Sequence, residues 1–294
     1  MSHSILDIIG NTPLVISKAI NTNPKVKLFF KLEGNNPGGS VKDRAALNMI
    51  KGGLERGDFD VNSKLIEATS GNTGIALAMI AGIYGLDIEL VMPENSTKER
   101  VQTMRAYGAK VTLTPADVGI EGARDYAELK VKEEGYTMIN QFSNDDNWKA
   151  HYISTGPEIW RDTQGEITHF VSSMGTTGTI MGTSTFLKEK NSKIQIVGVQ
   201  PADEAKIPGI RKWPVEYLPK IFNPKKVDSV MEVTEQEARD MAKRLAKEEG
   251  IFAGMSSGGA AAAAVKLAQS LEEGIIVSIV CDRGDRYLSS DLFD

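Results

Sequence analysis

The chain has 294 residues, of which 41% are hydrophobic and 25% are charged, so it can bury a substantial core and is not compositionally disordered. The formal net charge is −5 and lysine and arginine form no block, which argues against nucleic acid as a partner. The single cysteine, Cys281, excludes an internal disulfide and a zinc site built from paired cysteines.

The sequence also argues against a membrane location. Residues 1–10 lack the basic and apolar regions of a signal peptide. The longest apolar stretch, residues 75–84, is about half as long as a helix that spans a bilayer. We therefore expect a cytoplasmic protein with no membrane partner.

Apolar runs of strand length alternate with helical patterns along most of the chain. Strands are predicted at residues 27–32, 64–68, 88–92, 111–114, 169–172, 194–199 and 275–281. Helices are predicted at residues 40–56, 74–84, 98–107, 122–133, 179–188, 235–248 and 258–270. The strands are apolar without strict alternation, which is typical of strands buried on both faces. This pattern predicts an α/β fold with mostly parallel sheets.

The polar segment 140–148 is the predicted boundary between two α/β units. Each unit contains a strand, a turn of small residues and a helix. Residues 201–224 are rich in proline and predict a long loop. Long ordered loops in compact domains are frequently functional.

The first candidate motif is NPGGSVKDR, residues 36–44. Ser40 is a plausible helix N-cap, with Asp43 completing an imperfect capping box, so Lys42 falls in the first helical turn. The helix dipole and burial both disfavour an ammonium group there, and the free amine is the form that attacks a carbonyl in Schiff-base chemistry. The alternative is a surface lysine that follows a loop.

The second motif is EATSGNTG, residues 67–74, between a predicted strand and a predicted helix. Its glycines allow backbone N–H groups to approach a ligand, and a helix N-terminus attracts anions. Hydroxyl and amide side chains add further donors. A substrate carboxylate suits this turn, and a merely polar connection is the alternative.

The third motif comprises Gly175, Thr176, Thr177, Gly178 and Thr179, which follow a strand and open a helix. The same physics predicts a phosphate-binding turn. The turn lacks the lysine of a Walker motif and the spacing of a dinucleotide-binding motif.

The fourth motif is AGMSSGG, residues 253–259, which enters an alanine-rich helix. A serine hydroxyl at such a turn can form a hydrogen bond with a ring nitrogen. Capping of the helix by Ser256 or Ser257 is the alternative. Together the four motifs supply an amine, a carboxylate site, a phosphate site and a neutral polar group, which match what a protein provides to pyridoxal phosphate (PLP) and an amino acid.

The order NPGGSVKDR, EATSGNTGIALA, SSMGTTGT and GMSSGG resembles the cysteine synthase family of fold-type II PLP enzymes. The resemblance runs from IIGNTPL at residues 8–14 to CDRGDRY at residues 281–287, which is nearly the whole chain. The segment IPGIRKWP at residues 207–214 and the ending CDRGDRYLS are similar to the B branch of that family.

The resemblance implies two three-layer α/β/α domains with mostly parallel sheets. Residues 1–12 and 35–146 would form the smaller, mobile domain with the carboxylate loop. Residues 13–34 and 147–294 would form the larger domain with the phosphate site. A homodimer is also implied.

The resemblance assigns roles to the motif residues. Lys42 would be the catalytic residue and hold the cofactor covalently, Asn72 would bind its ring oxygen, and Ser256 would meet its ring nitrogen. The phosphate would be held by Gly175, Thr176, Thr177, Gly178 and Thr179. The substrate carboxylate would be bound by Thr69, Ser70, Gly71, Asn72 and Thr73, with Gln141 assisting.

The implied reaction is cysteine biosynthesis, in which sulfide or thiosulfate replaces the acetate of O-acetyl-L-serine and gives L-cysteine or S-sulfocysteine. Arg211, beside Lys212 and Trp213 in the proline-rich loop, is predicted to meet the incoming anion, and a solvated basic loop is the alternative. We predict no metal, because His3, His151 and His169 lack ligand spacing. Cys281 is interpreted as a small core residue, and the resemblance places it near the mouth of the site.

Other functions are compatible with the same cofactor. An O-phosphoserine sulfhydrylase, a cystathionine β-synthase and a serine/threonine dehydratase are the enzymatic alternatives. A non-catalytic homologue that binds a metabolite or a partner is the alternative of another class. Lys42 argues against that class, because a binding protein needs no reactive amine.

Overall fold

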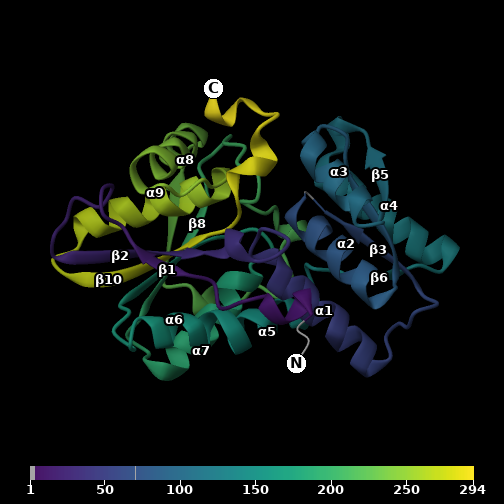
Figure 1. Ribbon diagram of the computed structural model, residues 1–294, viewed down its shortest axis with the longest axis horizontal. Helices are drawn as coiled ribbons and strands as arrows, with labels where there is room; N and C mark the ends of the chain where they lie inside the picture. Colours follow the sequence, from purple (N-terminus) through teal and green to yellow (C-terminus); the bar gives the residue numbers. More distant parts are fainter. Residues whose placement is uncertain (1–3, 70) are drawn as a thin grey trace.

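The computed structural model describes residues 4–69 and 71–294. Within these residues the strands form a six-stranded sheet, ordered β1-β2-β10-β7-β8-β9, and a four-stranded sheet, ordered β5-β4-β3-β6. Figure 1 shows the two sheets side by side, each with its own helices. The described strand pairs are parallel except β1 with β2. The predicted α/β fold with mostly parallel sheets is confirmed.

The six-stranded sheet is covered by helices on both faces. Its strands are β1 (Leu14–Ile16), β2 (Val26–Leu32), β7 (His169–Ser173), β8 (Gln195–Pro201), β9 (Ser229–Val233) and β10 (Gly274–Val280). One face carries α8 (Glu235–Glu249) and α9 (Met255–Ser270), and the other carries α5 (Asp145–Ala150), α6 (Gly156–Asp162) and α7 (Gly178–Lys190) (Figure 1). Successive residues of a strand pack into the cores on opposite faces of the sheet. In β7, Val171 packs with α9, and Phe170 packs with α7. This explains why the strands lack polar alternation.

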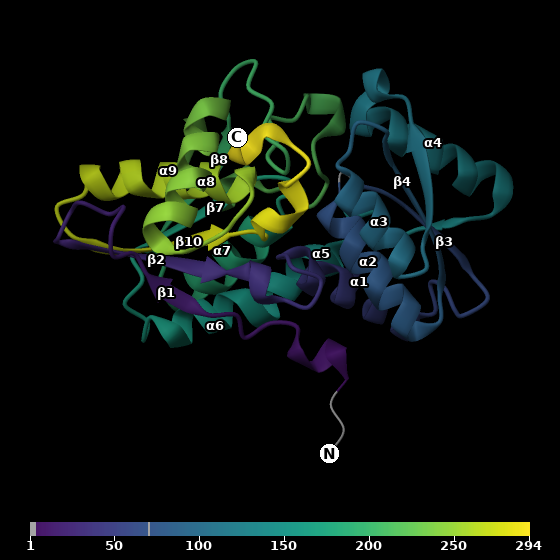
Figure 2. The ribbon, with the colours of Figure 1, turned by 45° about the horizontal axis from the view of Figure 1, so that its top comes forward.

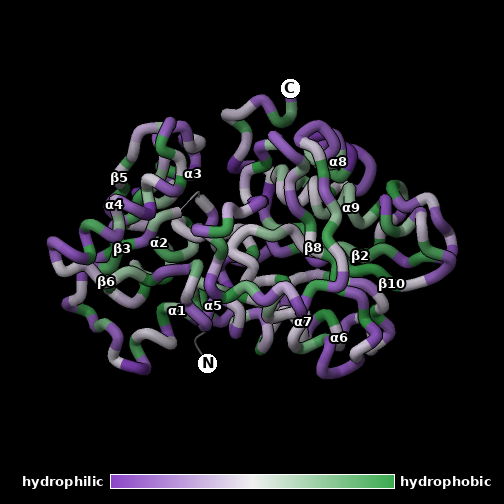
Figure 3. Tube along the Cα trace, turned by 180° about the vertical axis from the view of Figure 1, so that it is seen from behind, coloured by the Kyte–Doolittle hydropathy of each residue, from purple (hydrophilic) through white to green (hydrophobic). Residues whose placement is uncertain are grey.

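The four-stranded sheet has the same layering on a smaller scale. Its strands are β3 (Lys64–Ala68), β4 (Asp87–Pro93), β5 (Lys110–Thr114) and β6 (Thr137–Met138). One core contains residues of α1 (Lys42–Arg56), α2 (Asn72–Tyr84) and α3 (Lys98–Ala106), and α4 (Gly119–Glu134) packs in a second core. Figure 3 shows hydrophobic residues concentrated along the strands of the molecule, for example β2 and β10.

The chain contributes to the six-stranded sheet both before and after it builds the four-stranded one. β2 pairs with β10 over seven residues, from Val26 with Gly274 to Leu32 with Val280. Residues 282–294 then run back toward the smaller sheet, where the Thr97 hydroxyl donates to the Arg286 carbonyl at 3.0 Å. This last segment is yellow in Figures 1 and 2 and lies between the two groups of helices. The exact domain limits given above stay a prediction.

A buried charge network holds the first turn of α1. The Arg44 guanidinium lies 2.7 Å from the Glu33 carboxylate and 2.6 Å from that of Glu158, and Lys31 lies 2.8 Å from Glu158. Burial acts to raise the pKa of Glu158, but Arg44 and Lys31 outweigh it and lower that pKa to about 2. These contacts link α1 to the end of β2 and to α6. Arg44, at the centre of the network, is two residues after Lys42.

In the part of the chain that the structure describes, no helix combines the length and the apolar character needed to cross a bilayer.

Candidate active site

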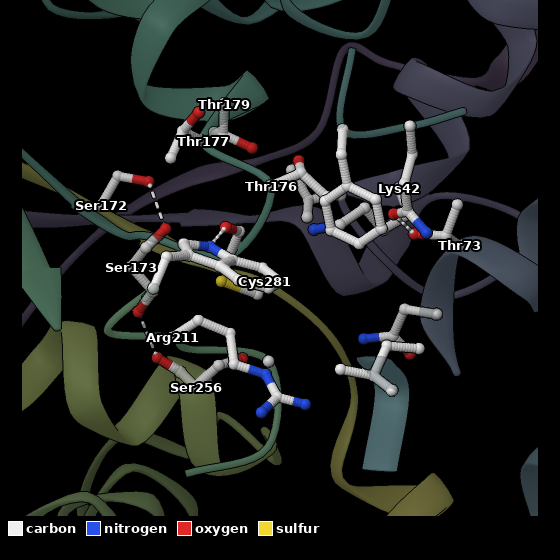
Figure 4. Close-up of a pocket in the computed structure, with 18 of the residues that line it drawn as sticks. Lys42, Thr73, Ser172, Ser173, Thr176, Thr177, Thr179, Arg211, Ser256 and Cys281 are labelled. Carbon is white, nitrogen blue, oxygen red and sulfur yellow. Dashed lines mark hydrogen bonds between the residues drawn. The ribbon is translucent and has the colours of Figure 1, made fainter. Parts of the chain in front are cut away.

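A cavity lies between the two sheets, beyond the carboxyl ends of β3, β7 and β10. It measures about 900 Å³, including space open to solvent. The predicted site residues that line it are Lys42, Asn72, Thr73, Gln141, Gly175, Thr176, Thr177, Thr179, Arg211 and Ser256. Carboxyl ends of parallel strands are the usual place for ligand sites in α/β proteins. In the view of Figure 4, Thr177 and Thr179 lie on one side of the cavity, and Lys42 and Thr73 lie on the other.

Lys42 lies in the first turn of its helix, as the motif predicts, and is the first residue of α1, but the predicted capping is wrong. Val41 occupies the N-cap position, and the Ser40 hydroxyl accepts a hydrogen bond from the Lys42 N–H at 3.2 Å. The Asp43 carboxylate turns back to accept from the Gly38 N–H. A Cβ on Gly38 would lie 2.6 Å from that carboxylate, so a side chain at this position would displace the Asp43 carboxylate.

The turn of residues 175–179 has the features of an anion site. Thr177 adopts a left-handed backbone conformation, with φ of 71°, and is the N-cap of the 13-residue helix α7. Its hydroxyl is buried and has no hydrogen-bond partner within residues 4–69 and 71–294. The first backbone N–H groups of a helix also lack internal partners. An orphaned hydroxyl beside a helix N-terminus fits a phosphate group.

Neighbouring side chains hold this turn in place. The Asn147 amide donates to the Thr176 hydroxyl at 3.1 Å, and the Trp213 indole donates to the Gly175 carbonyl at 2.7 Å. A Cβ on Gly178 would clash with the Asn147 side chain, so Gly178 acts through close packing and does not line the cavity. Asn147 has no motif that would have identified it from the sequence.

The loop after β3 is only partly exposed to the cavity. The Thr69 hydroxyl accepts from the N–H groups of Gly71 and Gly74, both at 3.0 Å, and so closes the turn. Thr69 and Gly71 do not line the cavity, and Ser70 lies outside the described residues. The Thr73 hydroxyl donates to the Gln141 side chain at 2.7 Å, which brings together two residues that the resemblance assigns to substrate.

The Asn72 side chain is held from two directions by the C-terminal segment. Its amide nitrogen donates to the Asp282 carboxylate at 2.7 Å, and its amide oxygen accepts from Arg286 at 2.6 Å. Both partners are buried. Local sequence patterns do not reveal these partners, because they follow Asn72 by more than 200 residues.

Ser256 is available to a ligand because it does not cap its helix. Gly254 is the N-cap of α9, and the Ser257 hydroxyl accepts from the Cys281 N–H at 2.9 Å, so the capping alternative is wrong. The Ser173 hydroxyl donates to the Ser256 carbonyl at 2.7 Å (Figure 4). Burial raises the pKa of the Cys281 thiol to about 11, so Cys281 lines the cavity as a neutral group.

The two cationic residues of the loop 211–213 lie in different surroundings. Arg211 lines the cavity, with its guanidinium 5.8 Å from the centre of the Trp213 ring. Lys212 instead binds Asp203 at 2.7 Å and Glu232 at 2.9 Å on the exposed surface. Of these two cations, Arg211 lines the cavity and Lys212 does not.

Comparisons with known proteins agree with the resemblance. The chain is 56% identical over 291 residues to cysteine synthase B of Pseudomonas aeruginosa, covering 99% of this chain and 97% of that protein. It is 53% identical over 286 residues to cysteine synthase B of Escherichia coli, covering 97% and 94%. The crystal structure of cysteine synthase (OASS) from Entamoeba histolytica superposes with a TM-score of 0.92 at 38% identity, covering 100% of this chain and 91% of that one.

A family model described as "Pyridoxal-phosphate dependent enzyme" matches residues 5–282. The predicted resemblance to the cysteine synthase family is therefore confirmed. The turn at Thr177, the cavity and the amine of Lys42 are consistent with the cofactor of that family. This chain belongs to the family of pyridoxal-phosphate dependent enzymes.

Proposed function

We propose that this protein is a PLP-dependent cysteine synthase, which replaces the acetate of O-acetyl-L-serine with sulfur and yields L-cysteine. The observation that carries the proposal is the convergence of Lys42, Thr177 and Ser256 on one cavity. Identity of 56% to a protein named cysteine synthase B, over nearly the whole chain, supports the choice of reaction.

The described residues supply a suitable place for each part of PLP. The turn of residues 175–179 would hold the phosphate, Lys42 would hold the carbonyl carbon covalently, and Ser256 and Asn72 would meet the ring. When bound, PLP withdraws electrons from the α-carbon of an amino acid. The protein contributes the position of that carbon and the proton transfers around it.

Lys42 is the proposed general base. The Lys42 amine would remove the α-proton of the substrate, acetate would leave from the β-carbon with the bonding electrons, and the sulfur nucleophile would add there. Lys42 then returns the proton to the α-carbon. Acetate departs before the sulfur donor enters, so the kinetics should be ping-pong.

Ser256 favours elimination over long-lived carbanions. A neutral hydroxyl stabilises positive charge on a ring nitrogen less than a carboxylate does. The neighbouring Cys281 thiol is also uncharged, because burial raises its pKa. The site therefore places no anion beside the ring nitrogen through these two side chains.

The substrate contacts are proposed from the loop and from Arg211. Residues 69–73 and Gln141 would bind the substrate carboxylate, with Thr73 and Gln141 already in contact. Arg211 would attract an anionic sulfur donor, and this supports thiosulfate, with S-sulfocysteine as product, in addition to sulfide. Trp213 packs edge-on against Phe142, with ring centres 5.4 Å apart, and its ring centre lies 5.8 Å from the Arg211 guanidinium.

The organisation implied by the resemblance is part of the same proposal. Residues 1–12 with 35–146 would move as the smaller domain over the larger one, formed by 13–34 with 147–294. One hydrophobic core is built from buried residues within 20–30 and 171–292, and another from buried residues within 45–139, which supports this division. We also propose a cytoplasmic homodimer.

Substrate profiling tests the proposed reaction. Purified holoenzyme should release acetate and form cysteine from O-acetyl-L-serine and sulfide at a higher kcat/KM than from O-phosphoserine, from serine with homocysteine, or from threonine alone. A preference for O-phosphoserine would identify the sulfhydrylase alternative. Turnover of none of them, with PLP bound, would favour the non-catalytic alternative.

A further inference from the structure

Asp282 contacts Asn72, which is proposed to meet the PLP ring, and Ser257, which directly follows Ser256. It follows directly after Cys281 at the end of β10 and is only 1% exposed. One of its carboxylate oxygens accepts from the Asn72 amide and from the Tyr287 hydroxyl, both at 2.7 Å. The other oxygen lies 3.4 Å from the Ser257 hydroxyl, one residue after Ser256. Asp282 therefore touches the first turn of α2 and the first turn of α9.

The packing around Asp282 leaves little freedom for its carboxylate. A Cβ on Gly254 would lie 2.6 Å from the Asp282 oxygen that faces Ser257. Burial and the charge of Asp282 raise the pKa of Tyr287 above its usual range, so Tyr287 remains a hydrogen-bond donor. The first turn of a helix also favours a negative charge nearby.

Arg286 completes the arrangement from the other side of Asn72. Its guanidinium donates to the Asn72 amide oxygen at 2.6 Å and to the Gly38 carbonyl at 2.9 Å. Arg286 is 7% exposed, so this contact is shielded from water. The carboxylate and the guanidinium thus hold opposite ends of one amide group.

These two partners determine which way the amide of Asn72 faces. A carboxylate only accepts hydrogen bonds and a guanidinium only donates them. A flipped amide would set oxygen against carboxylate and N–H against guanidinium, and both contacts would be repulsive. An amide nitrogen has two N–H donors. The bond to Asp282 uses one and leaves the second without a partner within the described residues.

We propose that Asp282 is a positioning residue, which with Arg286 fixes the amide of Asn72 so that it presents an N–H donor to the oxygen of the cofactor ring. The inference rests on the proposed function, because it assumes that PLP occupies the cavity. It assigns no contact between Asp282 and the cofactor. Asp282 acts through Asn72.

The test is a double-mutant cycle on PLP binding to the apoprotein. The dissociation constant is measured by tryptophan fluorescence, and the absorbance maximum of bound PLP is recorded for the parent, Asp282→Asn, Asn72→Ala and the double variant. Asp282→Asn should weaken PLP binding about tenfold, as expected for one hydrogen bond to a partly buried group, and should shift the maximum. In the Asn72→Ala background the same change should alter neither quantity.

Tyr287→Phe is the matched control, because it removes another bond to the same Asp282 oxygen and leaves Asn72 intact. It should weaken PLP binding less than Asp282→Asn does, because the bond between Asp282 and Asn72 remains. If Asp282→Asn does not fold, as judged by circular dichroism of the apoprotein, Arg286→Lys replaces it in the cycle with the same expected pattern.

Two results overturn the proposal. One is parent-like affinity and spectrum in both Asp282→Asn and Arg286→Lys. The other is an equal loss with and without Asn72, which would mean that Asp282 acts on the fold and not on the amide. A parent apoprotein that binds no PLP would refute the proposed function as well, and this outcome is distinct because it does not depend on Asp282.

Discussion

The Thr179 hydroxyl lies 3.4 Å from Nε2 of His151, so a buried imidazole contacts the turn that is proposed to bind phosphate. The other ring nitrogen of His151 lies 2.8 Å from the Thr155 hydroxyl. Burial, assisted by the charge of Arg44, lowers the pKa of His151 to about 3. The imidazole is therefore neutral near pH 7 and holds Thr179 through a hydrogen bond without adding charge.

This relationship predicts a pH dependence of stability. Between about pH 6.5 and pH 3 the unfolded chain binds a proton at His151 that the folded chain does not bind. The free energy of unfolding should therefore fall by about 1.4 kcal/mol for each pH unit below 6.5 on account of this group, and the contribution is fully present above 6.5. His151→Gln should flatten the curve from pH 4.5 to 6.5 in urea unfolding of the apoprotein.

His169→Gln is the control for this measurement. His169 is half-buried, and burial lowers its pKa too, so its replacement should flatten the curve less. Unfolding curves for the parent and His151→Gln that stay parallel across this pH range would refute the prediction.

The buried network around Arg44 predicts a large loss of stability on substitution. Arg44→Met would leave Glu33 and Glu158 buried without their main partner. The free energy of unfolding should fall by about 3–5 kcal/mol. Arg244→Met, which removes an exposed pair with Glu248, should cost less than about 1 kcal/mol. Similar losses for the two variants in urea unfolding would contradict the assigned role of the network.

Ser256→Asp should change the chemistry at the cavity. A carboxylate at this position would stabilise positive charge on the ring nitrogen and favour carbanion chemistry over elimination. We expect kcat/KM for cysteine formation to fall about ten- to hundredfold, with a rise in side products of the amino-acid substrate. Steady-state kinetics with product analysis checks both effects. Unchanged turnover and product ratio would show that Ser256 does not tune the reaction.

Arg211→Ala separates the two proposed sulfur donors. Loss of a charged contact should lower kcat/KM for thiosulfate about ten- to hundredfold and leave that for sulfide within about threefold. Lys212→Ala is the matched control, because Lys212 binds Asp203 and Glu232 outside the cavity, and it should affect neither donor. An equal loss for both donors in Arg211→Ala would exclude a selective role.

The sequence predicted the elements and the turns of the site well, because both have local signatures. Apolar strands such as β3 were predicted with the observed bounds, and parallel strands bring their following turns to one edge of a sheet. β1 and β6, with three and two residues, are too short for any periodic pattern. β9 has mixed polarity and lies at the sheet edge, so it was also missed.

Local sequence patterns could not predict the contacts between segments that lie far apart in the chain. Asp282 and Arg286 reach Asn72 across 210 and 214 residues, and nothing in their own neighbourhood indicates that target. The position of Lys212 was also not predictable from its neighbours in the sequence. Its ion pairs with Asp203 and Glu232 depend on the fold. The crossing of the chain between the sheets was expected from the family resemblance alone.

Covalent attachment of the cofactor to Lys42 is the most direct measurement of the central claim. Purified protein reconstituted with PLP is reduced with borohydride, digested and mapped by mass spectrometry. We expect the cofactor mass on the peptide that contains Lys42, and its absence in Lys42→Ala. Attachment to a different lysine, or bound PLP that leaves Lys42 unmodified after reduction, would contradict the proposed mechanism.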